Sequence, residues 1–199
     1  IARCHGADTF IVFCESHTSR IPFNLLAMLL RAGFGIEDFA PDKARSHVRD
    51  LLPFADSEDL LLLEDLLGIG DPSQQPPGVD PDARRRRLIA LVVAAAKARG
   101  KPAVYFVEDV HWIDDISESM LTEIATALAQ TDSLLVLSYR PEYQGELARV
   151  RAARTIVLEP LGVSDTSTLV SELIGPGSSV ADLIGAIIER AAGIPYFAE

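Results

Sequence analysis

Residues 103–115, which read AVYFVEDVHWIDD, decide the fold of this chain. The first five of them are apolar without a break, which is typical of a parallel strand buried on both faces of a sheet. The run stops at two adjacent acids, Glu108 and Asp109. In open α/β sheets the ligand crevice lies beyond the carboxyl ends of the strands. We therefore predict a parallel α/β sheet with a ligand site at these two acids.

Two carboxylates in that position suit a hydrated Mg²⁺ ion and a nucleoside triphosphate. Magnesium keeps most of its waters and takes only one or two carboxylates in addition to phosphate oxygens. Glu108 is expected to hold the metal, directly or through water, and Asp109 to orient or deprotonate the water that attacks the terminal phosphate. The alternative is a buried strand that simply ends in two solvated acids.

The rest of the chain supplies the partners of that strand. Apolar runs predict further strands at residues 9–14 and 134–137, and a weaker one at 155–158. Periodicity and end signals predict helices over residues 22–33, 42–52, 56–67, 81–99, 116–130, 164–173 and 179–192. Strands and helices that alternate in this way make right-handed crossovers. The sequence changes character after Glu159, where we expect a domain boundary.

Composition narrows the class of protein. A chain of 199 residues with 48% hydrophobic content can bury a full-sized core. Its net charge of -11 argues against a surface that holds nucleic acid through many phosphate contacts. Two cysteines do not make a disulfide framework, and we find neither a signal peptide nor a stretch long enough to span a bilayer, so a cytoplasmic location is expected. The chain opens on Ile1 without a methionine and looks like a piece of something longer.

Three motifs follow one another in the order found in a known family. The strand that ends in EDVHWID, residues 108–114, resembles the Walker B region of bacterial signal-transduction ATPases with numerous domains. SYRPE, residues 138–142, resembles their sensor strand, and AAGIPYFAE, residues 191–199, resembles the glycine-x-proline motif of their helical lid. The resemblance implies a P-loop NTPase-type core over residues 1–159 and the beginning of an α-helical lid domain over 160–199.

The likeness is strongest to one group within that family. Residues 21–23, 80–84 and 108–120 resemble the ATPase-like middle segment of large bacterial regulators, which carry an adenylate/guanylate cyclase domain upstream or a LuxR-type helix-turn-helix downstream. The resemblance implies a switch driven by ATP and Mg²⁺ that controls the linked output domain. It allows a homo-oligomer, and it implies no direct contact of this segment with nucleic acid or membrane.

The resemblance also implies roles for single residues. Glu108 falls at the magnesium position and Asp109 at the water-positioning one, although the order Glu-Asp leaves open which acid does which job. Ser138 is assigned to nucleotide binding, because its neighbours suit phosphate chemistry. Arg140 could reach the terminal phosphate, where a guanidinium stabilises developing charge. The alternative for Arg140 is a surface arginine paired with Glu142.

The chain departs from the family pattern in one large respect. No part of it matches G-x-x-x-x-G-K-[ST], the loop that holds the β and γ phosphates. The missing strand of that loop would lie between the sensor strand and the last strand.

Pro195 is expected, by analogy, to pack against the nucleotide base, although Gly193-Ile194-Pro195 is also an ordinary helix stop. The alternative function is a non-catalytic interaction or scaffolding module, or a decayed ATPase fragment.

Two other clusters suggest different chemistry. Cys4, His5, Cys14 and His17 offer four possible zinc ligands, but adjacent Cys-His ligands are awkward and Cys14 falls inside an apolar strand. Residues 84–87 are four arginines in a row. Because four consecutive residues spread around a helix, we interpret them as a solvated or partner-contact face rather than a nucleic-acid site.

Overall fold

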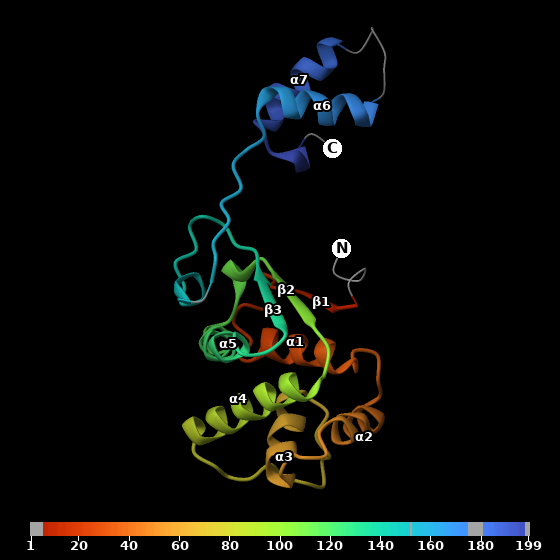
Figure 1. Cartoon of the computed structure of the whole chain (residues 1–199), viewed down its shortest axis with the longest axis vertical. Coiled ribbons are helices and arrows are strands. Elements are labelled where there is room, and N and C mark those ends of the chain that lie inside the picture. The colour runs from red at the N-terminus through yellow and green to blue at the C-terminus, as the bar shows by residue number, and fades with distance from the viewer. Residues whose placement is uncertain (1–5, 152, 175–180, 198–199) are drawn as a thin grey trace. The chain divides into compact units, whose positions relative to one another are not determined.

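The computed structural model describes residues 6–151, 153–174 and 181–197 (Figure 1). The chain divides into two compact units, Ile1–Ala153 and Arg154–Glu199. The first unit contains β1 (Asp8–Phe13), α1 (Asn24–Phe34), α2 (Pro41–Leu51), α3 (Ser57–Leu66), α4 (Pro81–Ala98), β2 (Ala103–Glu108), η2 (Val110–Trp112), α5 (Asp115–Leu128), β3 (Ser133–Leu137) and η3 (Leu147–Arg149). The second contains α6 (Val163–Ile174), α7 (Ala181–Ala191) and η5 (Pro195–Phe197). None of the described helices is long and apolar enough to cross a bilayer.

The three strands form one parallel sheet in the order β1-β2-β3. Asp8 pairs with Ala103 and Phe13 with Glu108, so β1 and β2 run side by side over their whole length. The sheet and its helices confirm the α/β class expected from the sequence. In this register all three strands end at the same edge, where Glu108 closes β2.

Helices α1 and α5 cover one face of the sheet (Figure 1). Val12 and Val107 point to that face and belong to one buried cluster with side chains of both helices. On the opposite face Ile11, Phe13 and Leu134 are 52%, 54% and 57% exposed. The prediction that residues 103–107 form a strand buried on both faces is therefore confirmed on the helix-covered face, where Ala103 and Val107 are buried, and only in part on the other, where Val104 and Phe106 are half-buried. The reason is topological, because right-handed crossovers that step in one direction along a sheet put every connection on the same side.

Helices α2, α3 and α4 form a second layer beneath α1 and α5 (Figure 1). Their core contains side chains that are almost completely buried, among them Ile36, Leu62, Leu63 and Leu88. Asp56 caps α3 through the amide of Glu58, and Asp80 caps α4 through that of Ala83. Local capping and apolar periodicity thus account for this layer.

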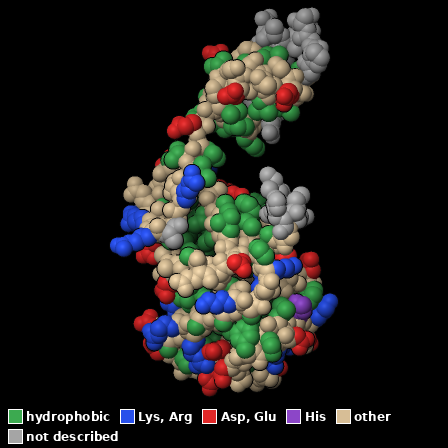
Figure 2. All heavy atoms as spheres, viewed as in Figure 1, with side chains coloured by type: hydrophobic (Ala, Val, Ile, Leu, Met, Phe, Trp, Pro, Cys, Tyr) green, Lys and Arg blue, Asp and Glu red, His purple; other side chains and the backbone are tan. Residues whose placement is uncertain are grey.

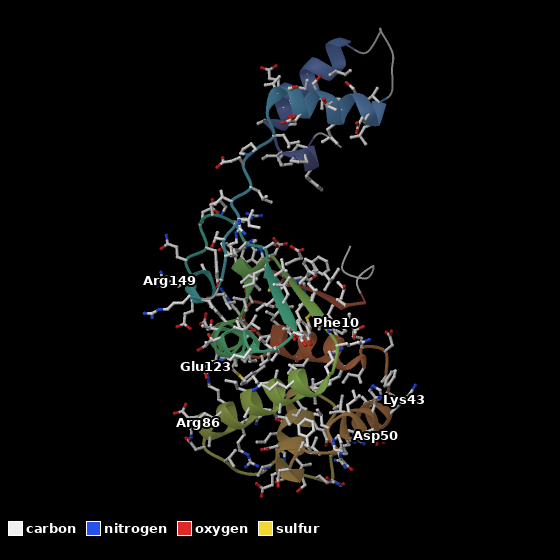
Figure 3. The ribbon with its side chains drawn as sticks, in the orientation of Figure 1. Phe10, Lys43, Asp50, Arg86, Glu123 and Arg149 are labelled. Atoms are coloured by element: carbon white, nitrogen blue, oxygen red, sulfur yellow. The ribbon has the colours of Figure 1, made fainter. Side chains whose placement is uncertain are left out.

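The four arginines at the start of α4 do not form a basic patch. Arg84 pairs with Asp65, Arg85 with Glu123, and Arg87 with Asp59. Arg86 points to solvent, and acidic and basic side chains are interspersed over this part of the molecule (Figures 2 and 3). The interpretation as a solvated or partner-contact face therefore stands, and the structure adds that three of the four arginines are ion-paired.

The second unit is a small helical hairpin. Val170 of α6 and Ala191 of α7 are buried against each other's helices, and Leu161 donates its amide hydrogen to the carbonyl of Gly193, with 2.7 Å between N and O. A side chain at position 193 would overlap the Leu161 carbonyl, and the residue has φ 79°, so glycine is needed here.

Residues 155–158 do not form the strand expected from their sequence. They have no regular structure, and Ile156, Val157 and Leu158 are 74%, 74% and 89% exposed. An apolar run becomes a strand only when a neighbouring strand takes its backbone hydrogen bonds, and the described strands give it no such neighbour.

Candidate functional site

The centre of the candidate site is a hydrogen-bonded link between two strands. The Ser138 hydroxyl, one residue past β3, donates to the Glu108 carboxylate at the end of β2. The same hydroxyl oxygen accepts from the Asp109 amide, with 3.1 Å between the atoms. The backbone forms a second link, since the Ser138 amide donates to the Val107 carbonyl and the Ser138 carbonyl accepts from the Val110 amide. Three predicted site residues, Glu108, Asp109 and Ser138, therefore lie together at the carboxyl edge of the sheet.

Asp109 has an unusual backbone conformation. Its φ is 57° and its ψ 41°, in the left-handed region that residues other than glycine rarely adopt. The cost is of the order of 1 kcal/mol, and such residues cluster at functional sites. The turn leaves the Asp109 side chain 59% exposed, while Val110 just after it is buried. One carboxylate thus faces solvent and the other is bound to a serine.

The residues nearest to these acids are packed away from water. His111 is mostly buried, and neither of its ring nitrogens has a hydrogen-bond partner among the described residues; its Nδ1 lies 3.9 Å from an Asp109 carboxylate oxygen. Cys14 is buried at the end of β1, next along the same edge. Burial raises the pKa of its thiol to about 12, and the charges of Asp109 and Asp114 add to the effect. Cys14 is therefore a packing residue and not a nucleophile.

Asp114 and Ser117 hold two helices together at this edge. Asp114 is 5% exposed, and its Oδ1 accepts from the Ser117 amide at 2.9 Å, which caps α5. The same oxygen accepts from the Phe23 amide at 3.0 Å, and the Ser117 hydroxyl oxygen accepts from the Leu26 amide at 3.2 Å. Helix α1 has no cap from its own Phe23, so α5 caps both helices. This arrangement fixes the loop after β1 next to the acids.

The loop beyond Ser138 is also fixed on α5. Glu118 accepts from the Tyr143 hydroxyl and from the Glu146 amide. A Cβ at Gly145 would overlap both the Glu118 carboxylate and the Tyr143 ring, so a larger residue there would displace this pair. Burial, together with the bond to Glu118, raises the pKa of Tyr143. The loop is therefore anchored close to Arg140.

The two remaining predicted residues, Arg140 and Pro195, belong to different units of the chain. Arg140 follows Ser138 by two positions and is exposed, and no ion pair to Glu142 or to the acids is present among the described residues. Pro195 lies in η5, in the second unit, and is exposed. The surface-pair alternative for Arg140 thus has no support from the described contacts.

The residues at this edge suit a hard cation better than zinc. Two carboxylates and a hydroxyl are oxygen donors, which Mg²⁺ prefers. For zinc, Cys4 and His5 lie outside the described residues, and within the described part no group of three or more His, Cys, Asp and Glu residues is placed to hold a metal. The amides of Phe23, Leu26 and Ser117 already donate to Asp114 and Ser117, so these three amides are not free to bind a phosphate.

Comparisons with known proteins add one relative. Over an alignment of 125 residues, which covers 60% of this chain and 12% of the relative, the chain is 36% identical to an uncharacterized protein, R02095, of Rhizobium meliloti (strain 1021). No family model and no solved structure matches the chain. The chain thus spans a small part of its relative's length, and its activity has to be argued from the site.

Sequence reasoning missed the role of Asp114. The D-x-x-S spacing of Asp114 and Ser117 is a helix-start signal that could have been noticed. The bond from Phe23 to Asp114 joins residues 91 positions apart, and no local pattern indicates it.

Proposed function

We propose that this chain carries the magnesium and water-activating half of a P-loop ATPase module. The observation that supports it most is the Ser138 hydroxyl, which joins the Glu108 carboxylate to the Asp109 amide across two neighbouring strands. A solvated acid beside an acid held by a serine, at the carboxyl end of a parallel strand, suits the metal-binding and water-positioning roles of phosphate chemistry.

The two acids have different tasks in this proposal. Glu108, oriented by Ser138, binds the metal or its water shell, and Asp109 accepts a hydrogen bond from the attacking water and holds it in line. Mg²⁺, when bound, neutralises charge on the β and γ phosphates. Arg140, exposed and two residues past Ser138, stabilises negative charge on the terminal phosphate.

The order of the strands supports the same proposal. β3 has β2 as its one neighbour among the described strands, so its other edge is available for pairing. The family likeness puts the strand of the phosphate-binding loop at that edge, between β3 and residues 155–158. Exposed Ile156, Val157 and Leu158 fit a segment that pairs only when this strand is present.

In the full protein the proposed module works as a switch. ATP binding and slow hydrolysis change the position of a helical lid, to which α6, α7 and Pro195 contribute, and so control a linked cyclase or helix-turn-helix output domain. ATP and Mg²⁺ are the proposed cofactors, and the module acts in the cytoplasm.

The test compares Mg-ATP binding by calorimetry in two polypeptides: this 199-residue chain and the full product of its gene. We expect binding by the full product, with hydrolysis reduced at least tenfold by Asp109→Asn and binding retained. The matched control is Asp115→Asn, an exposed acid at the start of α5, which should hydrolyse ATP normally. Absence of binding by the full product overturns the proposal.

A second candidate is a scaffolding module without turnover. Exposed Ile11, Phe13 and Leu134 on one sheet face support it, because an apolar area of this kind is typical of a protein contact. Normal signalling by a full-length Asp109→Asn protein, together with loss of signalling in Phe13→Asp, favours this candidate.

A further inference from the structure

A cavity of about 840 Å³ lies at the other end of the sheet from the acids. Side chains of α1, α2, α4, α5 and the sheet line it, and three of these residues, Leu26, Leu121 and Ile124, are buried. Protein cores contain few voids larger than a water molecule, whereas small-molecule pockets measure roughly 300–1,000 Å³. The hollow is therefore of ligand size rather than a packing defect.

The walls of the cavity determine which ligand would bind. They are mainly aliphatic and aromatic side chains, and the solvent-exposed part of the lining includes Leu51, Ala98 and Lys101. Phe10 forms part of the wall, on the side of β1 that faces α1 (Figure 3). Such a surface binds an apolar body and leaves a polar head at the opening.

The polar groups in the lining carry a net positive charge. Arg99 Nη1 lies 2.7 Å and Lys101 Nζ 2.8 Å from the two oxygens of Asp8. Two cations thus share one carboxylate. Arg99 is further fixed by its bond to the Gly33 carbonyl and by its position over the Phe10 ring, 4.8 Å from the ring centre. The opening is therefore complementary to one negative charge.

We propose that this cavity binds a long-chain aliphatic carboxylate, with its chain between α1, α4 and α5 and its carboxylate at Lys101 and Arg99. The site is separate from the proposed ATPase site, because Asp8 and Lys101 lie at the amino ends of β1 and β2 and Glu108 at the carboxyl end. Binding is thus expected whether or not the chain binds ATP.

The test measures whether hexadecanoic acid displaces a fluorescent, dansyl-labelled undecanoic acid from the chain. Both acids are kept below the concentrations at which they aggregate. Ala95→Phe fills the cavity from α4, and Ala98→Phe narrows it at an exposed position that tolerates bulk. Both should weaken binding at least tenfold. Ala90→Phe, exposed on the same helix and outside the cavity lining, is the matched control and should bind normally. Equal binding by all three variants overturns the proposal.

Charge variants test the position of the carboxylate. Lys101→Glu should weaken hexadecanoate binding about tenfold, and Asp8→Asn should strengthen it severalfold because it removes the competing carboxylate. The matching primary alcohol should respond to neither change; an equal response of acid and alcohol overturns the assignment. Vesicles of phosphatidylglycerol offer anionic head groups without a free chain, so capture by vesicles without binding of the free acid also overturns it.

Discussion

The two ends of the same three strands differ in almost every physical respect. At the carboxyl end Glu108, Asp109 and Ser138 form a hydrogen-bonded polar edge above a tightly packed layer that includes Val110. At the amino end the same strands border a hollow of about 840 Å³, lined mainly by apolar side chains. Strand geometry does not distinguish the ends; the segments that pack against each end do.

The difference has a clear structural origin. Asp114 and Ser117 tie the starts of α1 and α5 together at the carboxyl end. At the far end of α1, Arg99 bonds the Gly33 carbonyl, and residues of α4 line the space between the helices and the strands. The hydrogen bonds of Asp114 and Ser117, which we call the clamp, lie at the carboxyl end, and the cavity opens at the amino end. The predictions below test this contrast.

The largest expected effect is on the chemical reactivity of Cys14. Burial and the nearby carboxylates raise its pKa to about 12, so the folded chain should hold on the order of a thousandfold less thiolate than an ordinary cysteine at pH 8. In a Cys4→Ser background, alkylation by iodoacetamide should be very slow and should still accelerate between pH 9 and 10. The same protein in guanidinium chloride is the control, and its rate should level off in that range. Fast reaction of the folded chain at pH 8 would show an open carboxyl end.

Removing the clamp should destabilise the fold strongly. Asp114→Ala removes the cap of α5, about 1 kcal/mol, and leaves the Phe23 amide without its partner, about 1–2 kcal/mol more. We expect a loss of about 2–3 kcal/mol in the free energy of unfolding, measured by urea denaturation. The control is Asp115→Ala, an exposed neighbour, which should change little. Equal losses in the two variants would be inconsistent with the clamp.

Added volume should destabilise the carboxyl end and have little effect at the amino end. Val110→Leu adds one methylene to a fully buried position and should cost about 1–2 kcal/mol. Ala95→Leu adds a larger group next to the cavity and should change the stability by no more than about 0.5 kcal/mol. Both are measured by thermal and urea unfolding. If Ala95→Leu costs as much as Val110→Leu, the hollow is closed in solution.

The smallest expected effect concerns the ion pairs of Asp8 with Lys101 and Arg99 at the amino end of the sheet. A hydrogen bond from Lys101, with the nearby charge of Arg99, lowers the pKa of Asp8. The Asp8–Lys101 pair therefore stabilises the folded chain fully at neutral pH. This stabilisation is lost as the pH falls through the lowered pKa of Asp8. Lys101→Ala should cost about 0.5 kcal/mol at pH 7, less in high salt, and nothing in acid. An effect that grows toward low pH would have the wrong sign.

The sequence predicts the three strands of the sheet, most helices and the position of the two acids at a strand end, because these features depend on local patterns. The run at residues 103–107 predicts β2, apolar periodicity predicts the helices, and the two acids stand at the end of β2 in the chain itself. Residues 155–158 show the limit, because their apolar pattern predicts a strand and yet no neighbouring strand is there to pair with it.

What the sequence determined by itself is therefore the order of the elements and the placing of Glu108 and Asp109 at a strand end. Only the tertiary structure decided that Ser138 joins them, that Asp114 reaches Phe23, and that the amino end is hollow. The physical reason is range. Helix caps and apolar periods act over three or four residues, whereas a bond between positions 91 residues apart, or a cavity bordered by several elements, exists only after those elements have packed.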